Sequence, residues 1–297
     1  MNIRLFVCLA IPFLFPSFSY SNDSLLISKK RKIFIGTSTA VAYSGSLVYL
    51  NQIWYKPYHT SRFHFFNDNA EWAKMDKCGH IFTAWHTTHY LNQIYSYAGY
   101  KHSQSISTLI AWTYLLNIEI MDGFSSGWGF SWGDFTANTI GTLAYWLQNN
   151  YVPDLFSLKF SFISSPYAQY NPSLLGKSFY EQIIKDYNGQ IYWLNISPFY
   201  HWKQNMEWLC LSFGYGIDGF IGAKTNIYYR NNQYYDYSSI SRQQQFYLSI
   251  DIDLSKLKTH KKWLHQVLKS INWIKIPAPA LEWKGNNLYF RPLLFSN

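Results

Sequence analysis

The sequence predicts an α+β fold, with an N-terminal four-helix bundle, membrane-associated or periplasmic, and a C-terminal antiparallel β-rich region with one or two helices. Long stretches without charge, each long enough for a helix, fill the first half of the chain. After Pro153 apolar and polar residues alternate in short runs, as on half-buried strands. We therefore expect a signal peptide at 1–21, a helical bundle at 28–153 and a β-rich domain at 154–297.

The first residues have the three parts of a secretory signal peptide. Arg4 supplies a short charged start, residues 5–15 form an apolar core, and residues 17–21 form an exit rich in small side chains. The chain is therefore expected to be exported to the cell envelope. A periplasmic or outer-membrane-associated location is expected, with the inner membrane as the alternative.

The composition favours an envelope protein over a cytosolic enzyme or a nucleic-acid-binding protein. Aromatic residues make up 21% of the 297 residues and charged residues only 14%. Tyr and Trp are favoured where one surface is both wet and apolar. The net charge of +9 comes from scattered basic residues, apart from clusters at 29–32 and 256–262. We expect a membrane or envelope component as partner and no nucleic acid, and the sequence does not indicate an oligomeric state.

Four uncharged stretches are expected to form the helices of the bundle. About 20 apolar residues suffice to cross a bilayer, so the stretches are either membrane spans with a polar interior or packed helices of a periplasmic bundle. The basic residues at 29–32 would lie outside the inner membrane after signal cleavage, which is against the usual charge bias. The stretches are 33–55, 78–100, 102–118 and 135–153.

In the β-rich region the alternation is clearest at 158–162 and 246–254, where Asp251 and Asp253 are expected on a solvated strand face. A basic amphipathic helix is expected at 256–272. Its apolar side carries Trp263, Leu264, Val267 and Leu268. Weaker strands are expected at 191–196, 207–216, 225–230 and 287–295, and a further helix at 177–186.

The few charged residues of the bundle indicate a polar site in its interior. Residues four apart share a helix face, so Asp76 and His80 lie on one polar stripe, and Asp134 and Asn138 lie on another. Glu119 lies on an apolar face, where a carboxylate without a partner would be costly. Between Lys77 and Asn150 the only charged residues are Lys101, Glu119, Asp122 and Asp134.

Smaller features of the same helices refine this expectation. Gly141 shares the face of Asp134 and allows a neighbouring helix to approach closely. Ser131 is expected to cap the last helix, with Asp134 as the acid of a capping box. Lys77 points about 100° away from its neighbour Asp76 on a helix, so it is expected to pair with Glu119 or Asp122 across the bundle.

Three interpretations of this polar site remain open, and in the last of them His80, oriented by Asp76, acts as a general acid or base without a metal. In the first, it is a hydrogen-bonded network that fixes the packing of the helices in a structural or interaction protein. In the second, a divalent metal is the cofactor of a hydrolase or transferase acting on envelope lipid or glycan, because carboxylates with an imidazole suit Zn, Mn or Mg. Asp76, His80 and Glu119 would then be the metal ligands and catalytic residues. A binding role is expected for Lys77, Asp122, Asp134 and Asn138.

The same motifs carry a resemblance to known families. The chain resembles the YfiM-like predicted periplasmic lipoproteins common in Bacteroidetes, which implies an envelope location and no established activity. A shorter resemblance, over 76–141, is to VanZ-like membrane proteins, some linked to glycopeptide resistance, which implies an envelope role. The motifs are 63–69, 75–80, Glu119 with 122–123, 128–134, 185–194 and 213–216.

Overall fold

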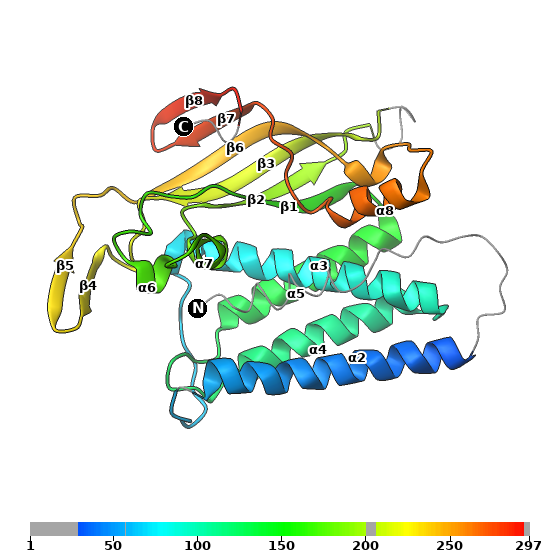
Figure 1. The fold of residues 1–297 in the computed structure, drawn as a ribbon, viewed down its shortest axis with the longest axis horizontal. Coiled ribbons are helices and arrows are strands. Elements are labelled where there is room, and N and C mark those ends of the chain that lie inside the picture. The colour runs from blue at the N-terminus through cyan, green and yellow to red at the C-terminus, as the bar shows by residue number, and fades with distance from the viewer. Residues whose placement is uncertain (1–28, 57, 200–205, 294–297) are drawn as a thin grey trace. The chain divides into compact units, whose positions relative to one another are not determined.

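The computed structural model describes residues 29–56, 58–199 and 206–293, and it confirms the α+β fold (Figure 1). The predicted signal peptide at 1–21 lies outside the described residues. The chain divides into two compact units. The helical unit contains the described residues up to Asp68 together with His80–Tyr151, and the sheet unit contains Asn69–Gly79 and the described residues from Val152 onward.

Four long helices run through the N-terminal part of the chain. The first helix starts at Lys29 instead of the expected residue 33. The basic residues 29–32 form its first turn. It ends before a single π-helical turn, Asn51–Tyr55. The helices are α2 (Lys29–Leu50), α3 (Met75–Ala98), α4 (Ser103–Gly123) and α5 (Trp132–Tyr151).

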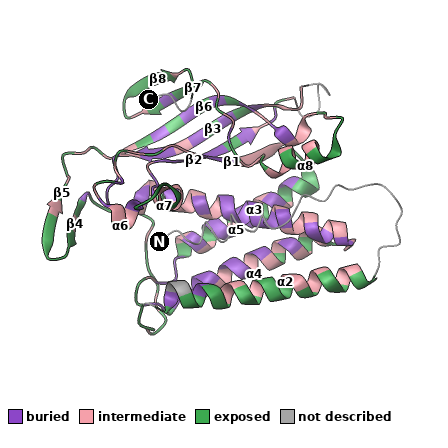
Figure 2. Cartoon of the chain, in the orientation of Figure 1, coloured by how far each residue is buried: buried purple, intermediate pink, exposed green. Residues whose placement is uncertain are grey.

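Within the helical unit, α2 packs along α4 through aromatic and aliphatic side chains. The rings of Tyr43 and Tyr114 meet edge to face with centroids 5.1 Å apart. Leu50 joins Leu115 and Ile118 in a buried cluster. In Figure 2 most of α2 is exposed or half-buried, whereas α4 carries a buried stripe. Helix α4 therefore has a central place in the core of this unit.

Among the described residues, α2 is the one helix that has both the length and the apolar composition for crossing a membrane, with a mean hydropathy of 1.3. It lies near the N-terminus. A signal sequence or a membrane anchor has the same length and composition.

The sheet unit is built on an antiparallel six-stranded sheet, with strand order β1-β2-β3-β6-β7-β8. A separate two-stranded ribbon, β4 with β5, extends from it (Figure 1). The sequence did not predict β5 and β7, which are short strands of four and five residues. The strands are β1 (Phe156–Phe162), β2 (Gln190–Ile196), β3 (Leu209–Asp218), β4 (Ile227–Arg230), β5 (Gln233–Asp236), β6 (Gln243–Ile252), β7 (Ala280–Lys284) and β8 (Asn287–Arg291).

Short helices complete this unit. Ser178 caps the second of them by accepting a hydrogen bond from the Glu181 amide, as expected for an N-cap serine. The basic amphipathic helix forms as predicted, although it is shorter than the expected 256–272. The short helices are α6 (Pro172–Leu175), α7 (Phe179–Lys185), α8 (Lys262–Ser270) and two 3₁₀ turns, Glu71–Lys74 and Leu254–Lys256.

The main sheet has the opposite orientation from the one expected. On β6 the polar residues Gln245, Ser249 and Asp251 are buried, whereas the apolar residues between them, Phe246 and Ile250 among them, are exposed. The prediction that Asp251 lies on a solvated face was therefore wrong, and Asp253 is buried as well. The period of two was read correctly, but a period alone does not say which face turns inward.

Candidate functional site

The first candidate residue, Asp76, follows a strained turn in the sheet unit. Three consecutive residues, 72–74, have positive φ angles of 50°, 45° and 68°. This conformation costs residues other than glycine roughly 1 kcal/mol or more each. The Tyr215 hydroxyl donates to the carbonyl of Ala73 at 2.5 Å. The turn thus fixes where α3 begins, and with it the position of Asp76 in the first helical turn.

The Asp76 carboxylate is held by two neighbours in the sheet unit. The Tyr187 hydroxyl donates to its Oδ1 at 2.6 Å, and Lys77 Nζ lies 3.2 Å from its Oδ2. The expectation that Lys77 avoids its neighbour was therefore wrong, because its long side chain bends back along the helix. His80 follows Asp76 four residues later on the continuous helix α3, so the two side chains project from one helix face.

In the helical unit His80 lies between two residues of α5. Its Nδ1 is 3.0 Å from Oδ1 of Asn138, and its Nε2 is 3.4 Å from Oδ1 of Asp134. The Asn138 amide nitrogen faces Oε1 of Glu119 at 3.5 Å, which leaves the amide oxygen for His80. An amide oxygen only accepts hydrogen bonds, so Nδ1 of His80 carries a proton. Nε2 then faces a carboxylate oxygen.

The start of α5 places Asp134 accurately. Ser131 Oγ accepts a hydrogen bond from the Asp134 amide at 3.1 Å, which confirms the predicted cap. The same hydroxyl donates to Oδ1 of Asp68 at 2.7 Å. Asp134 is thus both a residue of the first helical turn and, through its carboxylate, a neighbour of His80.

The loop of residues 63–66, which is rich in aromatic side chains, supports the start of α5. The Phe66 amide donates to the carbonyl of Phe130, and the Phe130 amide donates to the carbonyl of His64, both at 2.9 Å. The Phe63 ring lies against Gly123, where an added Cβ would come within 2.3 Å of a ring carbon. The loop therefore ties the connection between α4 and α5 in place.

A close helix contact brings α3 and α5 together beside the site. A Cβ added at Gly141 would lie 2.4 Å from the carbonyl oxygen of Ile81 and 2.8 Å from Cβ of Ala84. Only glycine fits this approach, as the sequence predicted. It follows that the distances from His80 to Asp134 and Asn138 depend on Gly141.

The buried charged groups of the helical unit are acidic among the residues that the structure describes. Glu119, Asp122 and Asp134 are each no more than 4% exposed. Asp122 accepts a hydrogen bond from the Tyr55 hydroxyl at 2.8 Å. Among the described residues of the helical unit, no lysine or arginine is buried. We call Glu119, Asp134, His80 and Asn138, which are connected through the contacts of His80 and Asn138, the acidic cluster.

The sheet unit buries charge in a different arrangement, which the sequence did not predict. Lys159 Nζ lies 2.9 Å from Oδ2 of Asp251, and Lys275 Nζ lies 3.7 Å from Oδ1 of the same residue. Both lysines are fully buried, and each donates to a backbone carbonyl as well. Asn195 also donates to the Asp251 carboxylate. We call these four residues the lysine network.

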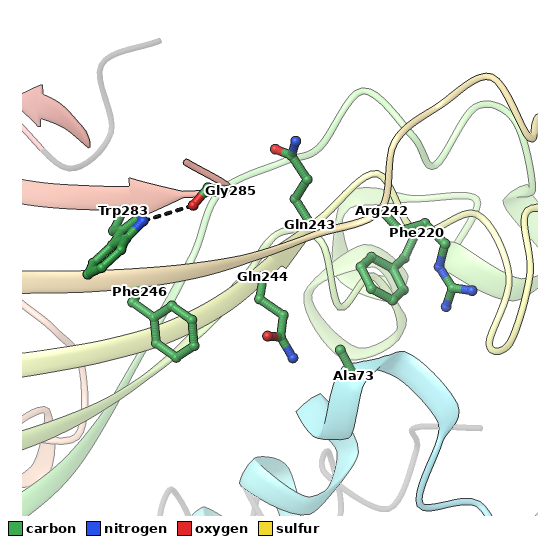
Figure 3. A pocket seen from close by; sticks show the side chains of 8 residues that line it. All are labelled: Ala73, Phe220, Arg242, Gln243, Gln244, Phe246, Trp283 and Gly285. Carbon is green, nitrogen blue, oxygen red and sulfur yellow. Dashed lines mark hydrogen bonds between the residues drawn. The ribbon is translucent and has the colours of Figure 1, made fainter. Parts of the chain in front are cut away.

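The sheet unit also contains a groove with a volume of about 900 Å³ (Figure 3). The Arg242 guanidinium lies over the ring of Phe220 at 4.1 Å and donates to the carbonyl of Ala223 at 2.7 Å. Arg242 is the one charged residue among those lining the groove. The described lining residues thus offer aromatic and amide surface for binding. Its lining is Ala73, Phe220, Arg242, Gln243, Gln244, Phe246, Trp283 and Gly285.

Cys78 lies on the first turn of α3, and burial raises the pKa of its thiol to about 11, with a smaller contribution from Asp76. The thiol therefore stays protonated at neutral pH, which makes it a poor nucleophile. Cys78 and Cys210 are both free.

The comparisons with known proteins concern mainly the helical part. Residues 64–150, less than half of the chain, match the family described as Predicted periplasmic lipoprotein (DUF2279). A search of curated proteins and a search of solved structures found no match. The matched segment contains Asp76 and all of the acidic cluster. The match and the apolar N-terminal helix identify the chain as an exported protein of the cell envelope.

Proposed function

We propose that this envelope protein binds a divalent metal ion through His80 and Asp134 of the helical unit. Both residues carry atoms that are common metal ligands. Asp76, which the sequence predicts as a ligand, lies one helical turn before His80 on α3. Compared with the set expected from sequence, Asp134 takes the ligand position of Glu119, because Asp134 lies next to His80 whereas Glu119 faces Asn138.

The observation that carries the proposal is the orientation of His80. With Nδ1–H donated to Asn138, the lone pair of a neutral imidazole at Nε2 is directed at a carboxylate oxygen 3.4 Å away. Two lone pairs repel each other at this distance, so a proton or a metal ion must lie between them. Histidine ligands of metals are oriented in this way, by a hydrogen bond from the other ring nitrogen.

Such a site would support metal-assisted hydrolysis or group transfer on an envelope lipid or glycan. A bound divalent ion lowers the pKa of a coordinated water and polarises a carbonyl or phosphoryl group. The side chain of His80 retains 14% exposure, which gives the site access from solvent. Asn138, whose amide nitrogen faces Glu119, would orient the imidazole of His80 through the hydrogen bond at Nδ1.

The second candidate is a structural polar network, in which a protonated His80 forms an ion pair with Asp134. The hydrogen bond from Tyr55 to Asp122 favours this function, because it ties the chain after α2 to α4. The VanZ-like resemblance would add an envelope role and no further chemistry to either candidate.

Elemental analysis of protein purified without chelator separates the two candidates. For a metal site we expect close to one divalent ion per chain in the parent, and loss of the ion in His80→Ala and Asp134→Asn. His102→Ala is the matched control, since His102 is exposed in the connection after α3. Asn138→Ala should lower metal affinity about 10–100-fold without abolishing it.

Thermal unfolding of the same proteins gives the second readout. Added metal should raise the melting temperature of the parent and of His102→Ala, and it should leave His80→Ala unchanged. Parent protein without metal, together with site variants that melt earlier whether or not metal is added, would exclude the metal site and favour the structural network.

A further inference from the structure

We propose that α8 and the basic segment before it form a docking element for the surface of an anionic phospholipid bilayer. The element consists of residues 256–274 of the sheet unit. It is independent of the metal site, because it involves neither the acidic cluster nor Asp76. The argument uses the exposed side chains of α8, the charge of the segment and its attachment to the sheet.

One side of α8 presents an apolar stripe to solvent. Trp263, Val267 and Ile271 follow one another at intervals of four residues, and they are 60%, 46% and 36% exposed. Residues at this interval lie along one line of a helix. The neighbouring Leu264 and Leu268 are half-buried. The apolar arc of the helix is thus wider than the part that packs on the protein.

The segment around this stripe is strongly basic. From Leu254 to Leu281 the sequence contains six lysines and neither aspartate nor glutamate. Lys258, Lys261 and Lys262 are exposed and directly precede Trp263. Lys275 is buried and Lys256 lies 3.8 Å from Asp253. The exposed positive charge therefore lies at the end of the helix where the tryptophan is.

This combination of charge and apolar surface fits a lipid surface with negative headgroups. Amphipathic helices that lie in the membrane interface combine lysines on the polar side with Trp and aliphatic residues on the other. Each lysine near an anionic surface adds about 1 kcal/mol of attraction. Tryptophan is favoured at headgroup level, where its ring is partly apolar and its N–H finds a polar partner.

The helix is firmly attached to the sheet unit, so docking would orient that unit on the membrane. Asn272, just after α8, accepts from the Leu254 amide and donates to Oδ1 of Asp253, both at 2.8 Å. The Phe160 amide of β1 donates to the carbonyl of Trp273 at 2.9 Å. A docked α8 would therefore hold β1 and its neighbours at a fixed height above the lipid.

The test places an environment-sensitive fluorophore at Trp263→Cys in the full chain. Vesicles of phosphatidylglycerol and phosphatidylcholine should shift its emission to the blue and raise its intensity, whereas vesicles of phosphatidylcholine alone should have little effect. The matched control is Trp283→Cys, because Trp283 is also 60% exposed but lies on β7, outside the basic segment. Labelled parent protein corrects for the native cysteines. This local readout does not respond to membrane contact by α2.

A double variant, Lys261→Gln with Lys262→Gln, tests the charge of the segment. It should weaken binding to the anionic vesicles roughly fivefold for each lysine lost. Lys177→Gln/Lys224→Gln removes the same charge from exposed sites elsewhere and should leave binding unchanged. An unresponsive label at 263, equal responses at 263 and 283, or equal weakening by both lysine pairs would overturn the proposal.

Discussion

The two units bury charged side chains in contrasting ways. In the sheet unit, Lys159 and Lys275 flank Asp251, and each ammonium group also donates to a backbone carbonyl. In the helical unit, the buried ionisable groups beside His80 are carboxylates, and His80 itself is partly exposed. The lysine network contains both signs of charge and is closed to solvent, whereas the acidic cluster has a route to solvent.

The difference separates a network built for packing from one suited to a ligand. Buried ions are tolerated when opposite charges and hydrogen bonds replace the lost water. The lysine network meets this condition with protein groups. The acidic cluster directs carboxylate and imidazole atoms toward one another, which suits a cation. Functional chemistry is therefore expected in the helical unit, and the lysine network is expected to act on stability.

The largest expected effect tests whether the lysine network depends on its one carboxylate. Asp251→Asn leaves two buried ammonium groups with no anion between them, so it should lower the free energy of unfolding by about 3–5 kcal/mol. The measurement is urea denaturation followed by circular dichroism. Asp236→Asn, on the exposed ribbon, should change the free energy by less than about 0.5 kcal/mol.

A triple replacement shows whether charge imbalance is the cause. Lys159→Met, Asp251→Leu and Lys275→Met together remove every charge of the network, and buried ion pairs replaced in this way often lose little stability. The triple variant should therefore be more stable than Asp251→Asn alone. If the triple variant were the less stable of the two, the hydrogen bonds rather than the charges would hold this part of the sheet.

The sequence predicted the helical unit better than the sheet unit, for a physical reason. Helix periodicity places residues three or four apart on one face, so the common faces of Asp134, Asn138 and Gly141 could be inferred. The residues that these side chains contact on the other helices could not be inferred. Whether Glu119 or Asp134 lies nearest to His80 depends on the rotation of α4 and α5, which one sequence does not determine. The same limit applies to Lys77, whose flexible side chain reaches its neighbour.

An intermediate effect is expected where α3 and α5 approach each other beside the acidic cluster. Gly141→Ala forces a methyl group against the Ile81 carbonyl, so it should cost about 1–3 kcal/mol and separate the two helices. Gly45→Ala is the matched control on α2. Nothing lies within 4 Å of a Cβ added at that exposed position, and alanine there should stabilise the helix by about 0.5–1 kcal/mol.

The Gly141 variant also sharpens the functional comparison. If the acidic cluster binds a metal ion, the altered distances around His80 should weaken metal affinity in Gly141→Ala and not in Gly45→Ala. Competition with a metallochromic indicator measures both. Equal affinities in the two variants would mean that the helix contact does not position the ligands.

In the sheet unit the strands were predicted more reliably than their orientation. Alternation at 246–254 gave the strand β6, but it led to Asp251 being assigned to the solvated face. The rule that apolar residues turn inward fails here because the residues facing the polar side, including Lys275 from the segment after α8, supply hydrogen-bonding partners. Contacts between segments so far apart in sequence are not visible in a local pattern. The lysine network could therefore not be foreseen.

The smallest expected effect is a pH dependence that belongs to the lysine network alone. Burial lowers the pKa of Lys275 from 10.5 to about 8, against the opposing influence of Asp251, which raises it. Between these two values the unfolded chain holds a proton that the folded chain has released. The free energy of unfolding therefore rises as the pH rises from 8 toward 10.5, and it falls again as the pH falls back through 8.

Relative to Lys275→Met, the free energy of unfolding of the parent should increase by about 1 kcal/mol between pH 8 and 9. Lys262→Met, at an exposed site, should run parallel to the parent. Urea denaturation at the two pH values measures all three proteins. Parallel curves for the parent and Lys275→Met would mean that Lys275 keeps its proton in the folded state, and the lysine network would then be a permanently charged structure.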